Sequence, residues 1–259
     1  MSGLSLVRWL LVAAAALAVA GGVLAPALLL SGGDDPDELL PDLRQLPPGA
    51  VAMVEVEGEH RLVFLSVVDN VGEAAIVIEG RRESRTEMAM AVEQVVTRSD
   101  RSSRSYSVDG EIRYVVSDTH EHWHLLDFER YSLHRVGDGA AVARDRKTGF
   151  CLGDRFDSAE SKLPNEPPRP VWVGECGRGG SGLLSIREGI SPGYGDDYVP
   201  ALEGQYLVVD EVPAGRYRLW HRVNPDGVLR ESDYSNNGAS VLLELTWTRG
   251  EPDVTVLEP

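Results

Sequence analysis

Short runs of β-branched and other apolar residues, separated by turn-forming residues, recur along most of the chain. Runs of this length bounded by Gly, Pro, Asn and Asp predict β-strands. The predicted strands occupy 51–56, 61–68, 74–79, 171–173, 205–210, 217–223 and 241–247. Many short strands joined by turns predict an all-β domain, and we expect an antiparallel β-sandwich with long functional loops.

Two further stretches have a less regular pattern. Residues 86–97 fit a helix and a strand equally well, because the apolar positions match both periods. Residues 105–116 predict a hairpin, because the Asp-Gly pair at 109–110 is a favoured turn sequence.

The first 30 residues form a separate segment. Residues 9–30 are an apolar run that follows the single charge of Arg8. About 20 apolar residues suffice to span a bilayer, whereas Ala18-Val19-Ala20 offers the cleavage site of an export signal. The segment therefore predicts a signal peptide or a transmembrane anchor helix, with the remaining protein extracytoplasmic, secreted or anchored. The expected organisation is this segment at 1–30, a linker at 31–41 and one domain at 42–259.

The chain is strongly acidic. It has 41 Asp and Glu against 25 Lys and Arg, a formal net charge of -16. This balance argues against a nucleic-acid partner, which requires a basic face, and is compatible with a cationic substrate. It is equally compatible with simple solubility of an exported protein.

The only two cysteines are Cys151 and Cys176, whose spacing matches no CxxC metal site. In an exported protein they would form one disulfide, and in a cytosolic protein they would be two buried thiols.

The stretch from His120 to His124 contains three of the six histidines, at alternate positions. Residues at i, i+2 and i+4 share one face of a strand, so His120, His122 and His124 would lie on one face and Trp123 on the other. In a flat strand the outer two Cα atoms would be roughly 13 Å apart, so three ligands on one ion require a bend or bulge. Imidazole ligands suit copper or zinc, and the spacing does not distinguish these metals.

Two long segments rich in Gly, Pro and Asp, 137–170 and 177–203, predict loops of a length that usually carries function. They contain Lys147 and Tyr198. Alone, a loop lysine is usually a solvated charge and a loop tyrosine a packing residue.

Together with the histidines, these residues resemble the lysyl oxidase family, copper amine oxidases that oxidise peptidyl lysine. Four segments carry the resemblance in the order of the family. They are His120-x-His122-x-His124-x-x-Asp127, Lys147 before Phe150-Cys151-Leu152, Ser191-Pro192-Gly193 followed by Tyr198, and Val223-Asn224-Pro225 followed by Glu231-Ser232-Asp233-Tyr234-Ser235-Asn236-Asn237.

The resemblance implies a copper ion on the three histidines and a lysine tyrosylquinone cofactor made from Lys147 and Tyr198. Such an enzyme deaminates primary amines oxidatively, with release of an aldehyde, hydrogen peroxide and ammonia. The catalytic base is open: Asp127, Asp196 and Asp197 are candidates by position. The expected substrates are lysine-bearing extracellular proteins or peptides, or small primary amines, and the only expected contact with a membrane is through the N-terminal segment.

The resemblance also implies a calcium site, because hard oxygen donors of the kind that calcium prefers are grouped in the fourth segment. The candidate ligands are Asp42, Leu43, Glu231, Asp233, Asn236 and Asn237. The alternative is that these polar residues only build and cap a turn.

The chain departs from vertebrate family members, which have more cysteines in this domain, and the resemblance makes Cys151–Cys176 the expected disulfide. A rival hypothesis from another class is a non-catalytic extracellular domain that binds copper or zinc, with Lys147 and Tyr198 unlinked. The two hypotheses differ in geometry, since the enzyme requires Lys147 and Tyr198 to approach each other near the imidazoles.

Overall fold

The structure is a computed structural model that describes residue 35 and residues 37–117, 121–145, 149–159, 162–200, 202 and 204–258. All regular elements in these ranges are β-strands, and every strand pair is antiparallel. None of these residues belongs to a helix with the length and hydropathy that a bilayer crossing requires. The predicted signal or anchor helix at 1–30 lies outside the described residues.

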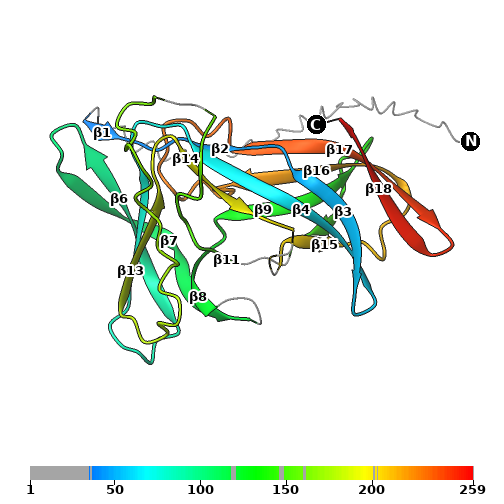
Figure 1. The fold of residues 1–259 in the computed structure, drawn as a ribbon, viewed down its shortest axis with the longest axis horizontal. Helices are drawn as coiled ribbons and strands as arrows, with labels where there is room; N and C mark the ends of the chain where they lie inside the picture. Colours follow the sequence, from blue (N-terminus) through cyan, green and yellow to red (C-terminus); the bar gives the residue numbers. More distant parts are fainter. Residues whose placement is uncertain are drawn as a thin grey trace, which may run out of the picture. The chain divides into compact units, whose positions relative to one another are not determined.

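The strands are ordered along the chain as shown in Figure 1. They are β1 (Glu38–Leu39), β2 (Leu43–Gln45), β3 (Gly49–Val56), β4 (Glu59–Asn70), β5 (Ile76–Arg81), β6 (Ala89–Arg98), β7 (Ser103–Val116), β8 (Glu121–Leu126), β9 (Glu129–Arg135), β10 (Ala141–Arg144), β11 (Gly149–Phe150), β12 (Phe156–Asp157), β13 (Ser185–Ile190), β14 (Tyr194–Tyr198), β15 (Tyr206–Val208), β16 (Gly215–Val223), β17 (Gly238–Thr248) and β18 (Glu251–Glu258).

The long strand β4 is the centre of one sheet. It pairs with β2, β3, β14 and β15, and β14 continues to β12. A second sheet has the order β10-β9-β16-β17-β18. Buried apolar side chains alternate along β9, β16 and β17, and β4 contributes a continuous buried run. They meet in one hydrophobic core, where the ring centroids of Phe64 and Tyr131 lie 5.1 Å apart.

The third sheet carries the histidine strand. Its order is β11-β8-β7-β6-β5-β13, with β1 added beside β6. Strand β8 thus lies between the long strand β7 and the two-residue strand β11. Residues 38–39 of the expected linker form β1 and pair with Thr97 and Arg98.

The hairpin predicted at 105–116 is wrong. Strand β7 runs unbroken from Ser103 to Val116, and the partner shifts from Val108 to Glu111 between Val92 and Ala91 of β6. Asp109 and Gly110 are therefore the additional residues of a β-bulge rather than a turn. Pairing with β6 both before and after the bulge overrides the local turn preference of the Asp-Gly sequence.

Several segments predicted as loops contain strands. The segment 137–170 includes β10, β11 and β12, and the segment 177–203 includes β13 and β14. Tyr198 therefore lies at the end of a strand. Residues 171–173, predicted as a strand, have no regular structure, and the ambiguous segment 86–97 is largely strand β6. The all-β, antiparallel prediction is confirmed.

Candidate metal and cofactor site

Strand β8 places two of the three predicted metal ligands on one face. His122 and His124 alternate with Trp123, whose side chain is fully buried and donates a 3.0 Å hydrogen bond to the carbonyl of Gly180. The Nε2 atoms of His122 and His124 are 2.6 Å apart, and their ring centroids are 4.5 Å apart. Two imidazole nitrogens that face the same point form the donor set that copper or zinc uses. His120 lies outside the described residues.

Gly149 packs directly against His124. It pairs with Leu126 across the β8–β11 ladder, and a Cβ at position 149 would lie 2.5 Å from the Cβ of His124. Only glycine lets the backbone at position 149 lie this close to the His124 side chain without a clash. In the sequence, Lys147 precedes Gly149 by two residues. Lys147 itself lies outside the described residues.

The next residue of β11 contacts Tyr198. The ring of Phe150 meets that of Tyr198 edge to face, with centroids 4.8 Å apart. Tyr198 is 5% exposed and is held on β14 by pairing with Ser66 of β4. One two-residue strand therefore has a contact to the histidine strand at Gly149 and a contact to Tyr198 at Phe150.

A buried carboxyl group lies beside the Tyr198 hydroxyl. Tyr198 donates a 3.0 Å hydrogen bond to Oδ2 of Asp196, which also accepts one of 2.9 Å from the amide of Gly153. Asp196 is 1% exposed, and burial raises its pKa to about 8, against the opposing effects of Arg155 and these hydrogen bonds. Burial, and then the neighbouring Asp196, raise the pKa of Tyr198 well above its usual value. Both groups therefore hold a proton at neutral pH.

The other candidate bases are placed differently. Asp127 is exposed in the turn after β8 and has a left-handed φ of 55°. Asp197 is half-buried and pairs through its backbone with Val67. Of the three carboxylates, Asp196 is the one with a hydrogen bond to Tyr198.

A surface hollow of about 200 Å³ lies beside the candidate metal and cofactor site. It is lined by His122, Cys151, Arg155, Glu175 and Arg178. Through it, solvent reaches a candidate metal ligand and the arginine whose Nε lies 3.8 Å from Asp196.

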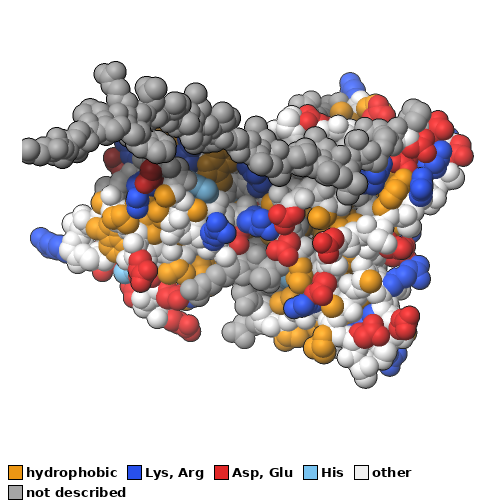
Figure 2. All heavy atoms as spheres, turned by 180° about the vertical axis from the view of Figure 1, so that it is seen from behind, with side chains coloured by type: hydrophobic (Ala, Val, Ile, Leu, Met, Phe, Trp, Pro, Cys, Tyr) orange, Lys and Arg blue, Asp and Glu red, His pale blue; other side chains and the backbone are white. Residues whose placement is uncertain are grey.

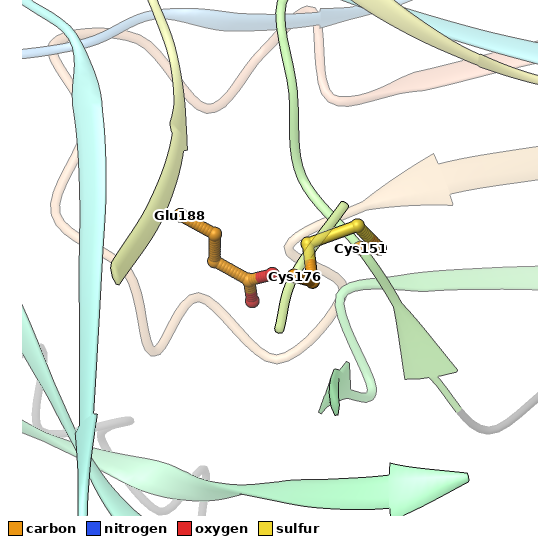
Figure 3. A group of neighbouring side chains, drawn as sticks. All are labelled: Cys151, Cys176 and Glu188. Atoms are coloured by element: carbon orange, nitrogen blue, oxygen red, sulfur yellow. A yellow bond between two sulfur atoms is a disulfide. The ribbon is translucent and has the colours of Figure 1, made fainter. Parts of the chain in front are cut away.

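The cysteines form the expected disulfide, Cys151–Cys176, which closes a loop with a sequence separation of 25. Figure 3 shows the Glu188 side chain pointing toward it from β13. The sulfurs are bonded to each other, so this cluster does not offer the thiolates of a metal site. Glu188 is 2% exposed, and burial raises its pKa well above the usual value. Its Oε2 accepts a hydrogen bond from the amide of Leu152.

The residues predicted to bind calcium come together from the two ends of the domain. Asn236 donates a 2.7 Å hydrogen bond to Asp42, and the amide of Leu43 donates one of 2.7 Å to Glu231. Glu231 also accepts a hydrogen bond from Asn237, and burial raises its pKa to about 7.

Oxygen atoms in this cluster remain available for a cation. The Oδ1 atoms of Asn236 and Asn237 are buried without a hydrogen-bond partner among the described residues. Asp233 is exposed at the edge of the cluster and close enough to contribute to a raised pKa of Asp42, whose main cause is burial. This set of hard oxygen atoms fits calcium.

Comparison with known proteins identifies the family. The lysyl oxidase family model matches residues 86–251, more than half of the chain. The chain belongs to the lysyl oxidase family.

Three relatives illustrate the similarity. Lysyl oxidase homolog 1 of Homo sapiens is 31% identical over 119 residues, which cover 46% of this chain and 18% of that protein. Lysyl oxidase homolog 2 of Gallus gallus is 31% identical over 130 residues, 50% of this chain and 15% of that protein. Protein-lysine 6-oxidase of Sus scrofa is 30% identical over 122 residues, 46% of this chain and 41% of that protein. The chain thus spans less than half the length of each.

Reasoning from the sequence missed two residues of this candidate site. Gly149 had no signal beyond its place between Lys147 and Phe150, because the close approach to His124 depends on strand pairing. Glu188 lies in a segment read as loop, so its burial beside the disulfide could not be predicted.

Proposed function

We propose that this protein is a copper-dependent amine oxidase that deaminates primary amines, with peptidyl lysine as the substrate class. The overall reaction is R–CH2–NH2 + O2 + H2O → R–CHO + NH3 + H2O2. The amine carbon loses two electrons, and dioxygen takes them to form hydrogen peroxide. The formal charge of -16 suits a cationic substrate.

The observation that carries this proposal is the position of β11. Gly149 lies against His124 and Phe150 lies against Tyr198, so strand β11, which follows Lys147 in the sequence, contacts both a proposed copper ligand and the proposed cofactor tyrosine. The proposed copper ligands are His120, His122 and His124, and the close Nε2 atoms of the latter two fit an imidazole-bound metal.

Copper with dioxygen would supply the oxidation that converts the Tyr198 ring, after which the Lys147 amine would join it to give lysine tyrosylquinone. The surrounding residues perform simpler tasks. Phe150 orients the Tyr198 ring, and burial excludes water from it. Asp196 holds the phenolic oxygen through a hydrogen bond, and its pKa of about 8 lets it accept or return a proton near neutral pH. We therefore favour Asp196 over Asp127 as the proton-transfer group.

The arrangement also supports three other expectations. Calcium would join Asp42 and Leu43 to the segment from Glu231 to Asn237, since the orphaned amide oxygens there fit a hard cation. The disulfide suits an oxidising, extracytoplasmic compartment, with lysine-bearing extracellular proteins as substrates. The two facing sheets around Phe64 and Tyr131 act in this interpretation as a β-sandwich scaffold.

The test is intact-mass analysis and peptide mapping of the full chain after copper loading under air. We expect a cross-linked pair of peptides containing Lys147 and Tyr198, with the mass change of quinone formation and reaction with phenylhydrazine. A Tyr198→Phe variant is the control, since it keeps the ring but removes the oxygen.

Two unmodified peptides from a copper-loaded, oxygenated sample would contradict the proposal. The protein would then be a metal-binding domain without this cofactor, the rival hypothesis from the sequence.

A further inference from the structure

The outer face of the second sheet holds a hollow of about 290 Å³. It is lined by Arg130, Ser132, His134, Arg144, Trp220, Arg222 and Pro225. None of these residues belongs to the candidate metal and cofactor site. Three arginines and no carboxylate among the lining residues are unexpected in a chain that has 41 acidic and 25 basic residues.

The sheet register places like charges opposite each other in this hollow. Arg222 of β16 pairs with Arg130 of β9, and the neighbour of Arg222 on its other side is Gly238 of β17. Like charges directly opposite in an antiparallel pair destabilise a sheet. Elsewhere on β16 the opposite arrangement occurs, since Arg216 pairs with Glu244 of β17 and lies 3.7 Å from its carboxylate. The hollow therefore departs from the charge pairing seen further along the same strand.

Among the described residues, only one of the three arginines that line the hollow forms an ion pair with a carboxylate. Arg130 makes a two-point ion pair with Asp226, at 3.2 and 2.8 Å, and this bond, with the nearby Asp127 and Asp145, raises the pKa of Arg130. Among the described residues, Arg144 and Arg222 have no carboxylate within ion-pair distance. Both arginines are exposed and line the hollow, and the guanidinium group of Arg222 lies near Gly238.

The remaining surface of the hollow offers a flat ring and a hydroxyl. Trp220 is half-buried and lies between Ser132 of β9 and Ser240 of β17 in the register, and Ser132 pairs in turn with Arg144 of β10. Guanidinium groups bind carboxylate, sulfate or phosphate oxygens through two parallel hydrogen bonds, and an indole face stacks on flat rings.

We propose that this hollow is a binding site for an oxyanion group carried on a flat ring, with Arg144 and Arg222 holding the oxyanion and Trp220 stacking on the ring. The site is separate from the amine oxidation proposed above and does not depend on it. It would let an acidic protein bind an anionic compound at a place other than its amine site.

The experiment uses the full chain and two probes, inorganic sulfate and benzenesulfonate, at constant ionic strength set with sodium chloride. Binding is followed by calorimetry and by the quenching of tryptophan fluorescence. We expect saturable binding of both probes, with benzenesulfonate the tighter ligand. Arg144→Gln and Arg222→Gln should each weaken binding roughly tenfold or more, the usual loss for a hydrogen bond to a charged group. Trp220→Ala should remove the advantage of benzenesulfonate and most of the quenching.

The matched control is Arg216→Gln, which removes an exposed arginine of the same strand that is already paired with Glu244. It should leave both affinities unchanged. Absence of saturable binding, or an equal loss in the control and in the hollow variants, would overturn the proposal. Equal affinity for the two probes in the wild-type protein would overturn the role of Trp220.

Discussion

A single added methyl group at Gly149 should displace the candidate metal ligand His124 by steric contact alone. In Gly149→Ala the new Cβ would lie 2.5 Å from the Cβ of His124 and 3.1 Å from its Cγ and Nδ1. Ordinary carbon contacts begin near 3.5 Å, so His124 or strand β11 must move by about 1 Å. Gly149 has no left-handed φ, so the backbone itself accepts alanine, and the effect is steric.

The size of the effect follows from the cost of overpacking, which is typically about 1–3 kcal/mol. If copper binding is weakened by this whole amount of free energy, the affinity for copper falls roughly 5- to 150-fold, since each 1.4 kcal/mol is a factor of ten. The assay is competition of the metal-free protein with a chromophoric chelator for copper, together with the electron paramagnetic resonance spectrum of the bound ion.

The control is Gly174→Ala, because a Cβ at position 174 meets no atom within 4 Å. Circular dichroism of both variants checks that each remains folded. A folded Gly149→Ala protein with the copper affinity and spectrum of the wild type would refute the reasoning, since His124 could not then be both a ligand and in contact with residue 149.

Three further predictions follow from the buried groups. The folded state holds Asp196 protonated up to a pKa of about 8, whereas the unfolded state releases this proton near 4, so stability falls as pH rises between these values. The free energy of unfolding of Asp196→Asn, measured with denaturant at several pH values, should not show this decrease, whereas that of Asp197→Asn should. Identical pH profiles for the two variants would contradict the burial argument. Calcium at 100 times its Kd should stabilise the folded state by about 2.7 kcal/mol and raise Tm by roughly 5–10 °C. The Glu231→Gln variant should lose this shift. Absence of a shift in the wild-type protein would contradict a calcium site. Replacing Cys151 and Cys176 with serine should lower the free energy of unfolding by about 3 kcal/mol for a separation of 25, as measured with urea, and an unchanged midpoint would contradict this.

The strands that could be predicted from the sequence are those whose alternation reflects burial. Strand β16 shows buried residues at Tyr217, Leu219, His221 and Val223, between exposed or half-buried ones, and this pattern is visible in the sequence. Strand β14, in contrast, reads Tyr-Gly-Asp-Asp-Tyr and has no apolar alternation. It is a strand because it pairs with β4, a contact that no local pattern contains.

Some features of the candidate site could likewise be predicted from the sequence, whereas others depend on tertiary structure. His122, His124 and Tyr198 could be predicted as candidates from spacing and from the family resemblance, and strand β11 contacts both the histidine strand and Tyr198. The hydrogen bond between Asp196 and Tyr198 could not be ranked above the alternatives, because Asp196 owes its burial to chain segments distant in sequence, such as Gly153. Position in the sequence treated Asp127 and Asp196 alike, and only tertiary structure separates them.

The disulfide affects both sides of the candidate site. The carbonyl of Cys176 accepts a 2.9 Å hydrogen bond from the amide of Trp123 on the histidine strand, and the carbonyl of Cys151 lies 3.4 Å from the Tyr198 hydroxyl. Oxidation of these two thiols therefore fixes the backbone on both sides of the site at once. Under reducing conditions, neither side of the candidate site would have this covalent restraint.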